Sequence, residues 1–237
     1  LPKIWGSLYN VRKFRDCRNS VTWHLRVENL RPETVYGMML YDKIGTGCVV
    51  YANGKKAGQA GIPAVNPDKT VMGFSMQPVY MQSDSAGIID IVIHNSNKTY
   101  RMGGIWGRFS IAEQPYFMHW YNGKINRRLL LSGILGVFVL YNMLLFFLMN
   151  KNRMNLYLAL LSLVLLVRTL TGEFSIFGVF FPHFPFDAEL RLEFLALPSI
   201  PLFLLLYIES LAGKTGRSGF IRIAEYIFSA ALILCIC

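Results

Sequence analysis

The chain has 237 residues, a net charge of +10 at pH 7 and a hydrophobic fraction of 53%. Its four cysteines are too few for a disulfide scaffold. The basic charge forms no stripe interleaved with exposed aromatic residues, which argues against a nucleic-acid partner. Lysines and arginines also flank membrane spans, so charge and apolar composition together direct attention to the lipid bilayer.

The first 120 residues carry the pattern of β-strands. Short runs rich in β-branched and aromatic residues are separated by glycine and proline. The dipeptide Asn53-Gly54 is a strong signal for a tight hairpin turn. The candidate strands lie at residues 21–27, 48–51, 88–94 and 106–111. No amphipathic helix interrupts them, so we predict an all-β antiparallel sandwich over residues 1–120.

The remaining sequence predicts membrane helices. Residues 129–149 form a run of 21 residues without a charge. As a helix this run would be about 31 Å long, enough to cross the hydrocarbon core. Weaker apolar runs follow at residues 155–170, 194–211 and 223–237. We therefore expect a linker at residues 121–128 and a helical transmembrane domain at residues 129–237 with about four spans. The chain opens without Met or a signal-peptide pattern, so we expect further protein on both sides.

Several short motifs occur in a fixed order along both halves of the chain. In the first half they are Leu1-Pro-Lys-Ile-Trp5, Val50-Tyr-Ala-Asn-Gly-Lys55, Ile93-His-Asn-Ser96 and Gly103-Gly-Ile-Trp106. In the second half they are Tyr141-Asn-Met, Asn150-Lys-Asn-Arg153, Leu156-Tyr-Leu-Ala-Leu160, Arg168 with Gly172-Glu173, and Arg191-Leu-Glu-Phe194. Together they make the chain resemble the bacterial seven-transmembrane receptors with diverse intracellular signalling modules.

This resemblance implies a fold, a location and a function. The fold would be an extracytoplasmic jelly-roll sandwich, galactose-binding-like, followed by a helical bundle in the bacterial cytoplasmic membrane. A small-molecule ligand would bind outside, with carbohydrate suggested by analogy with other jelly rolls. A missing cytoplasmic output domain, such as a kinase, cyclase or phosphatase, would follow the remaining spans and could mediate a homodimer. Cations are nearly balanced between the two sides, so the orientation rests on the resemblance.

No residue pattern predicts catalysis. The four histidines lack metal-ligand spacing with one another or with the cysteines, and we interpret them as surface or structural residues. No glycine-rich loop follows a strand and opens a helix, and no nucleophile elbow occurs in the sequence. We therefore expect this part of the protein to be no enzyme, with no cofactor and no metal site.

A candidate ligand site lies between two of the predicted strands. Asn95, Arg101 and Trp106 could supply an amide, a guanidinium fork and a stacking face for a sugar or a carboxylate. Each structural alternative is simple: Asn95 could bond to turn backbone, and Trp106 could belong to the core. Cys17 and Cys48 also leave two alternatives open, a disulfide in an exported domain or two unrelated apolar residues.

Two features of the membrane half have alternatives as well. Arg168 lies in the outer half of the second predicted span, where it could pair with Glu173 or Glu193, or snorkel to the headgroups. The aromatic residues 174–186 could form a lid over the bundle, but we interpret them as an interfacial belt.

We interpret the chain as the sensory and membrane part of a transmembrane signalling receptor. Two rival classes remain. A membrane enzyme with an accessory carbohydrate-binding sandwich would carry clustered carboxylates or a metal motif outside this sequence. A membrane-anchored structural or adhesion protein would have no output domain.

Overall fold

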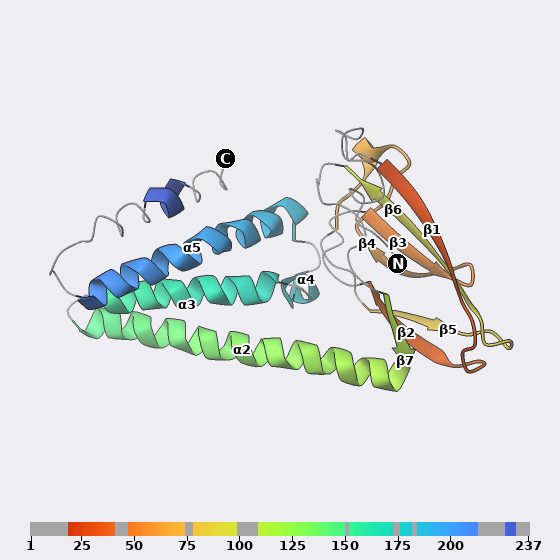
Figure 1. Ribbon diagram of the computed structural model, residues 1–237, viewed down its shortest axis with the longest axis horizontal. Coiled ribbons are helices and arrows are strands. Elements are labelled where there is room, and N and C mark those ends of the chain that lie inside the picture. Colours follow the sequence, from red (N-terminus) through yellow and green to blue (C-terminus); the bar gives the residue numbers. More distant parts are fainter. Residues whose placement is uncertain are drawn as a thin grey trace. The chain divides into compact units, whose positions relative to one another are not determined.

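The computed structural model describes residues 19–40, 47–73, 78–98, 109–149, 152–172, 176–181, 184–212 and 226–230 (Figure 1). The chain divides into two compact units. The first comprises Leu1–Lys124 and Glu173–Val179, and the second Ile125–Gly172 and Phe180–Cys237. The first unit contains the strands, and the second contains most of the helical residues.

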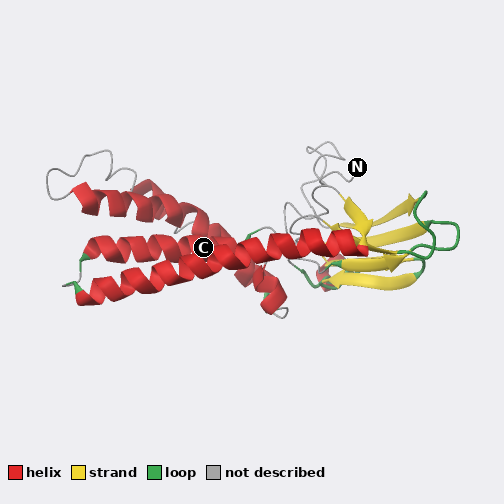
Figure 2. Ribbon diagram, turned by 90° about the horizontal axis from the view of Figure 1, so that it is seen from below, coloured by secondary structure: helices red, strands yellow, loops and turns green. Residues whose placement is uncertain are grey.

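The first unit holds two antiparallel sheets. Its strands are β1 (Asn19–Val27), β2 (Val35–Leu40), β3 (Gly47–Ala52), β4 (Lys55–Ala60), β5 (Val79–Gln82), β6 (Ile89–Asn97) and β7 (Phe109–Glu113). One sheet has the order β1-β6-β3-β4 and the other the order β5-β2-β7. Figure 2 shows the sheets as two layers. The predicted antiparallel sandwich is thereby confirmed, whereas the narrower assignment to the jelly rolls stays a prediction.

The four predicted strands correspond to β1, β3, β6 and β7, and the sequence reasoning missed the other three. Strand β2 contains a glycine and three consecutive sulfur-containing or aliphatic residues, β4 contains no β-branched or aromatic residue, and β5 is only four residues long. These segments become strands because neighbouring strands supply their hydrogen bonds, not because of intrinsic propensity.

The predicted turn joins β3 to β4. Asn53 and Gly54 both have positive φ, 48° and 75°, as a type I′ hairpin turn requires. The Asn53 side chain also donates to the Gln82 carbonyl at 2.9 Å and accepts from the Asp90 backbone N–H at 2.9 Å. One residue therefore closes the hairpin and connects it to both sheets.

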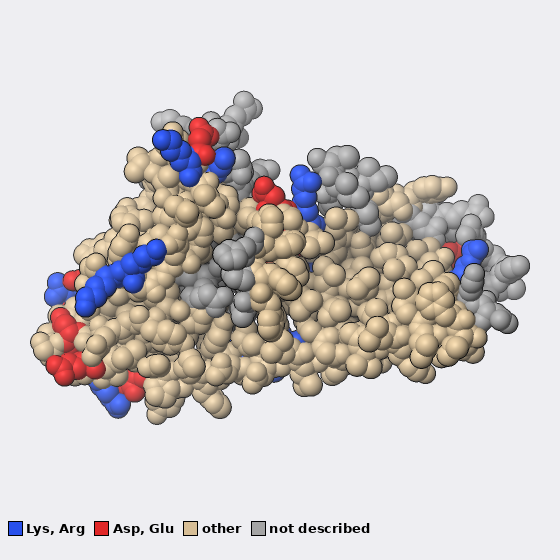
Figure 3. Space-filling model, turned by 180° about the vertical axis from the view of Figure 1, so that it is seen from behind, with Lys and Arg blue, Asp and Glu red and all other residues tan. Residues whose placement is uncertain are grey.

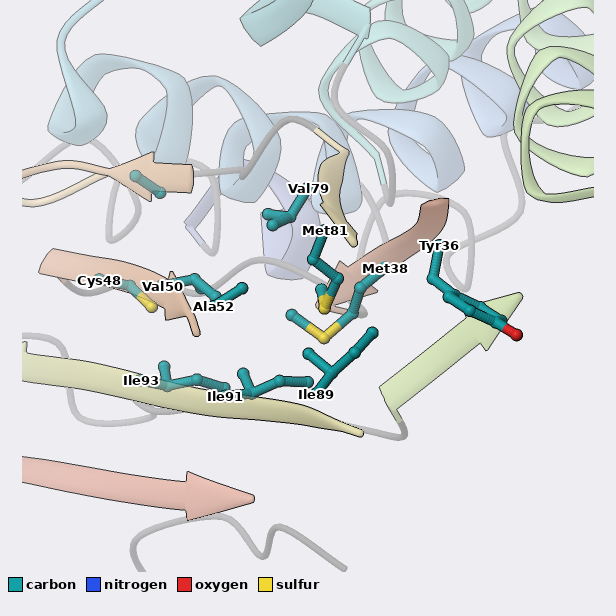
Figure 4. Packing of buried hydrophobic residues seen from close by; sticks show 11 residues of the cluster. Tyr36, Met38, Cys48, Val50, Ala52, Val79, Met81, Ile89, Ile91 and Ile93 are labelled. Atoms are coloured by element: carbon teal, nitrogen blue, oxygen red, sulfur yellow. The ribbon is translucent and has the colours of Figure 1, made fainter. Parts of the chain in front are cut away.

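A single hydrophobic core lies between the sheets. The side chains of β6 alternate, so Ile89, Ile91 and Ile93 point to one face and are fully buried. Figure 4 shows them opposite Met38 and Met81 of the other sheet. Residues from both sheets belong to the same cluster, which explains why the two layers form one unit.

The membrane half consists of long apolar helices. They are α2 (Gln114–Leu148), α3 (Arg153–Thr171) and α5 (Phe186–Ala212), and the short α4 (Ile176–Phe180) lies in the aromatic segment. Each of the three long helices has the length and hydropathy of a membrane span. Figure 3 shows one face along the middle of these helices without charged side chains. Three of the four predicted spans are thus found.

The structure describes only part of the predicted fourth span and places the predicted linker inside a helix. In the fourth predicted span, the structure describes residues 226–230, which are helical, and the other positions lie outside the described residues. Residues 121–128, the predicted linker, lie inside the continuous helix α2. The predicted domain boundaries, and the role of the aromatic segment as belt or lid, stay predictions.

Helices α3 and α5 pack against each other through small residues. Ala159 and Ser162 are buried on α3, and Ala196 and Ser199 are buried on α5. Small side chains let helix backbones approach closely, which drives association where lipid removes the hydrophobic effect between helices. The hydroxyls of Ser162 and Ser199 donate to backbone carbonyls of their own helices, so neither of these two hydroxyls is left unbonded.

The thiol of Cys48 gives a first test of this fold. Cys48 is a free, buried cysteine, and burial raises its pKa from 9.0 to about 12. Below pH 9 the thiol is protonated in both states, whereas between pH 9 and 12 it ionises only in the unfolded chain. The free energy of unfolding should therefore fall with rising pH in this window, by up to about 1.4 kcal/mol per pH unit from this group.

Chemical denaturation of the detergent-solubilised chain between pH 8 and 11 measures this slope. Cys48→Ala should make the slope shallower, while Cys17→Ala serves as the control for loss of a thiol. Equal slopes in both variants and in the unmodified chain would contradict a buried thiol at position 48.

Candidate functional site

The inner face of the four-stranded sheet becomes polar toward the end of β6. The alternation that places three isoleucines in the core continues with Asn95 and Asn97, each only 1% exposed. Asn95 lies opposite Val21 of β1 and Cys48 of β3 in the strand register. This end of the sandwich therefore buries amide groups in a row that is otherwise apolar.

Asn95 has no hydrogen-bond partner among the residues that the structure describes. Neither its Oδ1 nor its Nδ2 atom is bonded, although both atoms are inaccessible to solvent. The indole Nε1 of Trp23, which lies two pairs along the β1–β6 register and therefore on the same sheet face, is buried without a partner as well. Leaving such a group unsatisfied costs about 1–3 kcal/mol, so an amide at this position is unfavourable unless it serves another purpose.

The residue next to Asn95 has the opposite environment. Ser96 points to the other face of the sheet, where its Oγ accepts from the Ala64 backbone N–H at 3.0 Å and lies 2.9 Å from Thr70 Oγ1. These bonds attach residues 61–73 to the outer face of the sheet. Ser96 thus has a structural role, which distinguishes it from the unbonded Asn95.

The three predicted site residues can now be located. Asn95 lies in β6 on the buried face, and it makes no bond to turn backbone in the described part of the chain. Arg101 and Trp106 lie outside the described residues. Trp23 was not predicted as a site residue. The alternation of β1 could have identified Trp23, because the strand register places its side chain on the same sheet face as Asn95.

The titratable and metal-ligating side chains near this end of the sandwich have the following environments. Burial keeps the Cys48 thiol protonated, since its pKa is raised to about 12, so it is not a nucleophile at neutral pH. His94 points to the outer face, where its Nδ1 lies 2.8 Å from Thr22 Oγ1. Across the described residues, no three His, Cys, Asp or Glu side chains gather in the manner of a metal site.

A second notable contact joins the three-stranded sheet to the start of helix α2. This helix begins at the residue after β7, and Phe117 in its first turns is buried. A Cβ placed on Gly37 of β2 would lie 2.3 Å from Phe117 Cδ1, so the ring occupies the space of a side chain at position 37. The ring also packs edge-on against Tyr80 of β5, with centroids 6.1 Å apart.

The third feature is an ion pair inside the second unit. Arg168, in the last turn of α3, donates from Nη1 to Oε1 of Glu193 on α5. The side chains are 36% and 12% exposed. Arg168 lies in the last turn of α3, where the helix dipole favours a cation. The predicted partnership of Arg168 with Glu193 is confirmed.

A further cation lies near the same helix end. A Cβ on Gly172, which caps α3, would lie 3.5 Å from Arg128 Nη1 of α2. The last carbonyls of a helix lack intrahelical partners, so a guanidinium nearby is stabilising there. Arg168 and Arg128 therefore both lie near the C-terminal end of α3, where the helix dipole and the free carbonyls favour positive charge.

A β-sandwich joined to helices that can cross a bilayer defines a multi-pass membrane protein. Residues 127–237 match the family model described as "7TM diverse intracellular signalling". This match confirms the resemblance found in the sequence and places the membrane half in that family of membrane signalling receptors. No curated protein matches the chain.

One solved structure is similar to part of the chain, a GH2 beta-galacturonidase from Eisenbergiella tayi bound to galacturonate. The alignment has 15% sequence identity and a TM-score of 0.34. It covers 48% of this chain and 20% of that enzyme. A similarity of this size carries no argument about fold or ligand here.

The ion pair can be tested by a double-mutant cycle. Arg168→Ala and Glu193→Ala should each lower the free energy of unfolding by about 2 kcal/mol, since each leaves a poorly solvated charge. The double variant should lose less than the sum of the two. Thermal unfolding in lipid nanodiscs measures all four chains, and Arg191→Ala, an exposed cation on α5, is the control. Additive losses would exclude direct coupling between the two side chains.

Proposed function

We propose that the chain is the sensory and membrane part of a bacterial receptor that binds a small extracytoplasmic molecule and relays the event to a cytoplasmic output domain. The observation that carries the proposal is the buried, unbonded amide of Asn95 beside the unbonded indole N–H of Trp23. Natural proteins keep such groups mainly where function requires them.

The hydrogen-bonding groups favour a neutral hydroxylated ligand. An asparagine amide offers one acceptor and two donor hydrogens, and an indole adds a third donor. Neighbouring hydroxyl groups of a sugar or polyol can both donate and accept, which fits this set. The predicted rim residues Arg101 and Trp106 follow β6 in the sequence and would add a cation and a stacking surface. Carbohydrate remains an analogy with other jelly rolls, because a fold does not define a ligand.

Transmission requires that the ligand prefer one arrangement of the receptor. A ligand that bound two arrangements equally would shift neither population. A site inside the sandwich meets this requirement well, because a ligand there must displace strands that pack closely around the core. The receptor would sit in the bacterial cytoplasmic membrane with the sandwich outside, and a homodimer could form through the output domain.

Substitution of Asn95 tests the ligand site. In the absence of ligand, Asn95→Leu should raise the free energy of unfolding by up to about 1–3 kcal/mol, because it removes a buried unsatisfied amide and breaks no hydrogen bond. Asn97→Leu is the matched control on the same buried face. Asn97 has an interaction partner, so its replacement should cost about 1–3 kcal/mol.

Titration calorimetry of the full chain in detergent micelles, against neutral sugars, polyols and small carboxylic acids, provides the binding measurement. For any compound that binds, Asn95→Leu should weaken affinity at least about tenfold, or about 1.4 kcal/mol. Arg101→Ala tests the rim in the same way. Unchanged affinity in a folded Asn95→Leu chain would move the site away from this end of the sandwich.

The orientation has its own test. Single cysteines replace Val65, which is 92% exposed in the sandwich, and Arg153, the exposed first residue of α3, in a chain without native cysteines. In intact cells an impermeant thiol reagent should label position 65 and spare position 153. Labelling after membrane permeabilisation shows that both thiols are reactive. The reverse pattern in intact cells would place the sandwich in the cytoplasm.

A further inference from the structure

We infer that Phe117 is a positioning residue that fixes the rotation of helix α2 on the three-stranded sheet, and thereby the faces that the first span presents. The inference deepens the proposed function, because it names the contact through which the sandwich would control the membrane half. Its starting point is that α2 continues without a break from Gln114 to Leu148.

The contact has the form of a knob in a hole. Gly37 is the central residue of a row that points away from the core, between Tyr80 of β5 and Ala112 of β7. A Cβ at Gly37 would be 2.3 Å from Cδ1 and 2.4 Å from Cγ of Phe117. The ring can therefore occupy this position only because residue 37 has no side chain. A knob in a hole defines one rotation of the helix, whereas a smooth apolar surface would permit several.

Neighbouring aromatic rings hold Phe117 in place. Trp120 and Tyr121 follow at i+3 and i+4 on the same helix face, and their ring centroids are 5.8 Å and 6.2 Å from that of Phe117. Tyr80 Oη lies 2.7 Å from Met118 Sδ, which adds a contact between β5 and the helix. Tyr116, directly beside Phe117, is instead 72% exposed. One face of the first turns of α2 therefore carries the attachment.

Strand β2 connects this attachment to the core. Its alternation directs Tyr36 and Met38 into the sandwich and Gly37 toward Phe117. A rearrangement of the core would move β2, and the moving strand would carry the hole that holds Phe117. Because an α-helix is stiff along its length, rotation at Phe117 reaches the apolar residues of the span.

The test measures the rotation of the span directly. Spin labels are placed one at a time at residues 137–144 of α2, in the full chain without native cysteines, in nanodiscs. Oxygen accessibility along these positions should rise and fall with the helical period, since Leu140 is exposed and Asn142 is buried. The phase of that period reports which face of the helix is turned to lipid.

Phe117→Ala should shift this phase by more than about 30°, roughly a third of the 100° step between residues. Alternatively, it should abolish the periodic variation in oxygen accessibility along the helix. Tyr116→Ala, which removes an adjacent but exposed aromatic side chain, should leave the phase unchanged. Gly37→Ala should act like Phe117→Ala, because its new Cβ excludes the ring. Phe117→Leu keeps an apolar knob and provides a milder variant if the alanine variant does not fold.

The outcomes distinguish a contact that fixes the rotation of α2 from a contact that only stabilises the fold. If Phe117→Ala and Gly37→Ala lower the melting temperature but keep the phase, Phe117 only stabilises the fold and the inference is wrong. An equal shift with Tyr116→Ala would also overturn it. The measurement uses no ligand, so a failed ligand screen leaves this result intact, and an unchanged phase leaves the ligand site at Asn95 unaffected.

Discussion

Helix α2 is one continuous element that must be stable both in water, at its first turns, and in lipid, along its apolar span. The arrangement of the chain depends on this constraint. Inside a bilayer every backbone polar group must be bonded within the protein, which a helix achieves alone and an open sheet does not. The chain therefore changes from strand to helix at Glu113 and Gln114, within the water-soluble part. The first turns of α2 bury Phe117 against the sheet, and the turns from Leu129 onward expose mainly apolar side chains suited to lipid.

The sandwich illustrates how one residue step decides the environment of a polar side chain. Asn95 and Ser96 are neighbours in β6, yet they point to opposite faces of the sheet. Ser96 finds a backbone N–H and a hydroxyl on the outer face, while Asn95 enters the core without a bond in the described part of the chain. An apolar residue at position 95 would suit the fold better, and this is the physical reason behind the proposed ligand-binding role of Asn95.

The membrane helices solve a related problem with charge. Arg168 and Glu193 would each be costly alone in lipid, but they form a pair near the ends of antiparallel helices. The dipole of α3 favours a cation at Arg168, and partial exposure of Arg168 reduces its desolvation. Small residues on α3 and α5 allow the helices to come close enough for the pair to form.

The amino-acid sequence by itself determined three of the predicted spans, the Asn53-Gly54 turn and the strands with strong alternation, because each depends on local hydropathy or on the backbone preference of one or two residues. The expected helix directions placed Arg168 near Glu193, and the structure selected this pair over the alternatives of Glu173 and snorkelling. Strands β2, β4 and β5 needed the tertiary structure, since neighbouring strands supply what their composition lacks. The same is true of Trp23 beside Asn95 and of Phe117 over Gly37. These residues are far apart in the sequence, and only strand register and helix packing, which no local pattern encodes, bring them together.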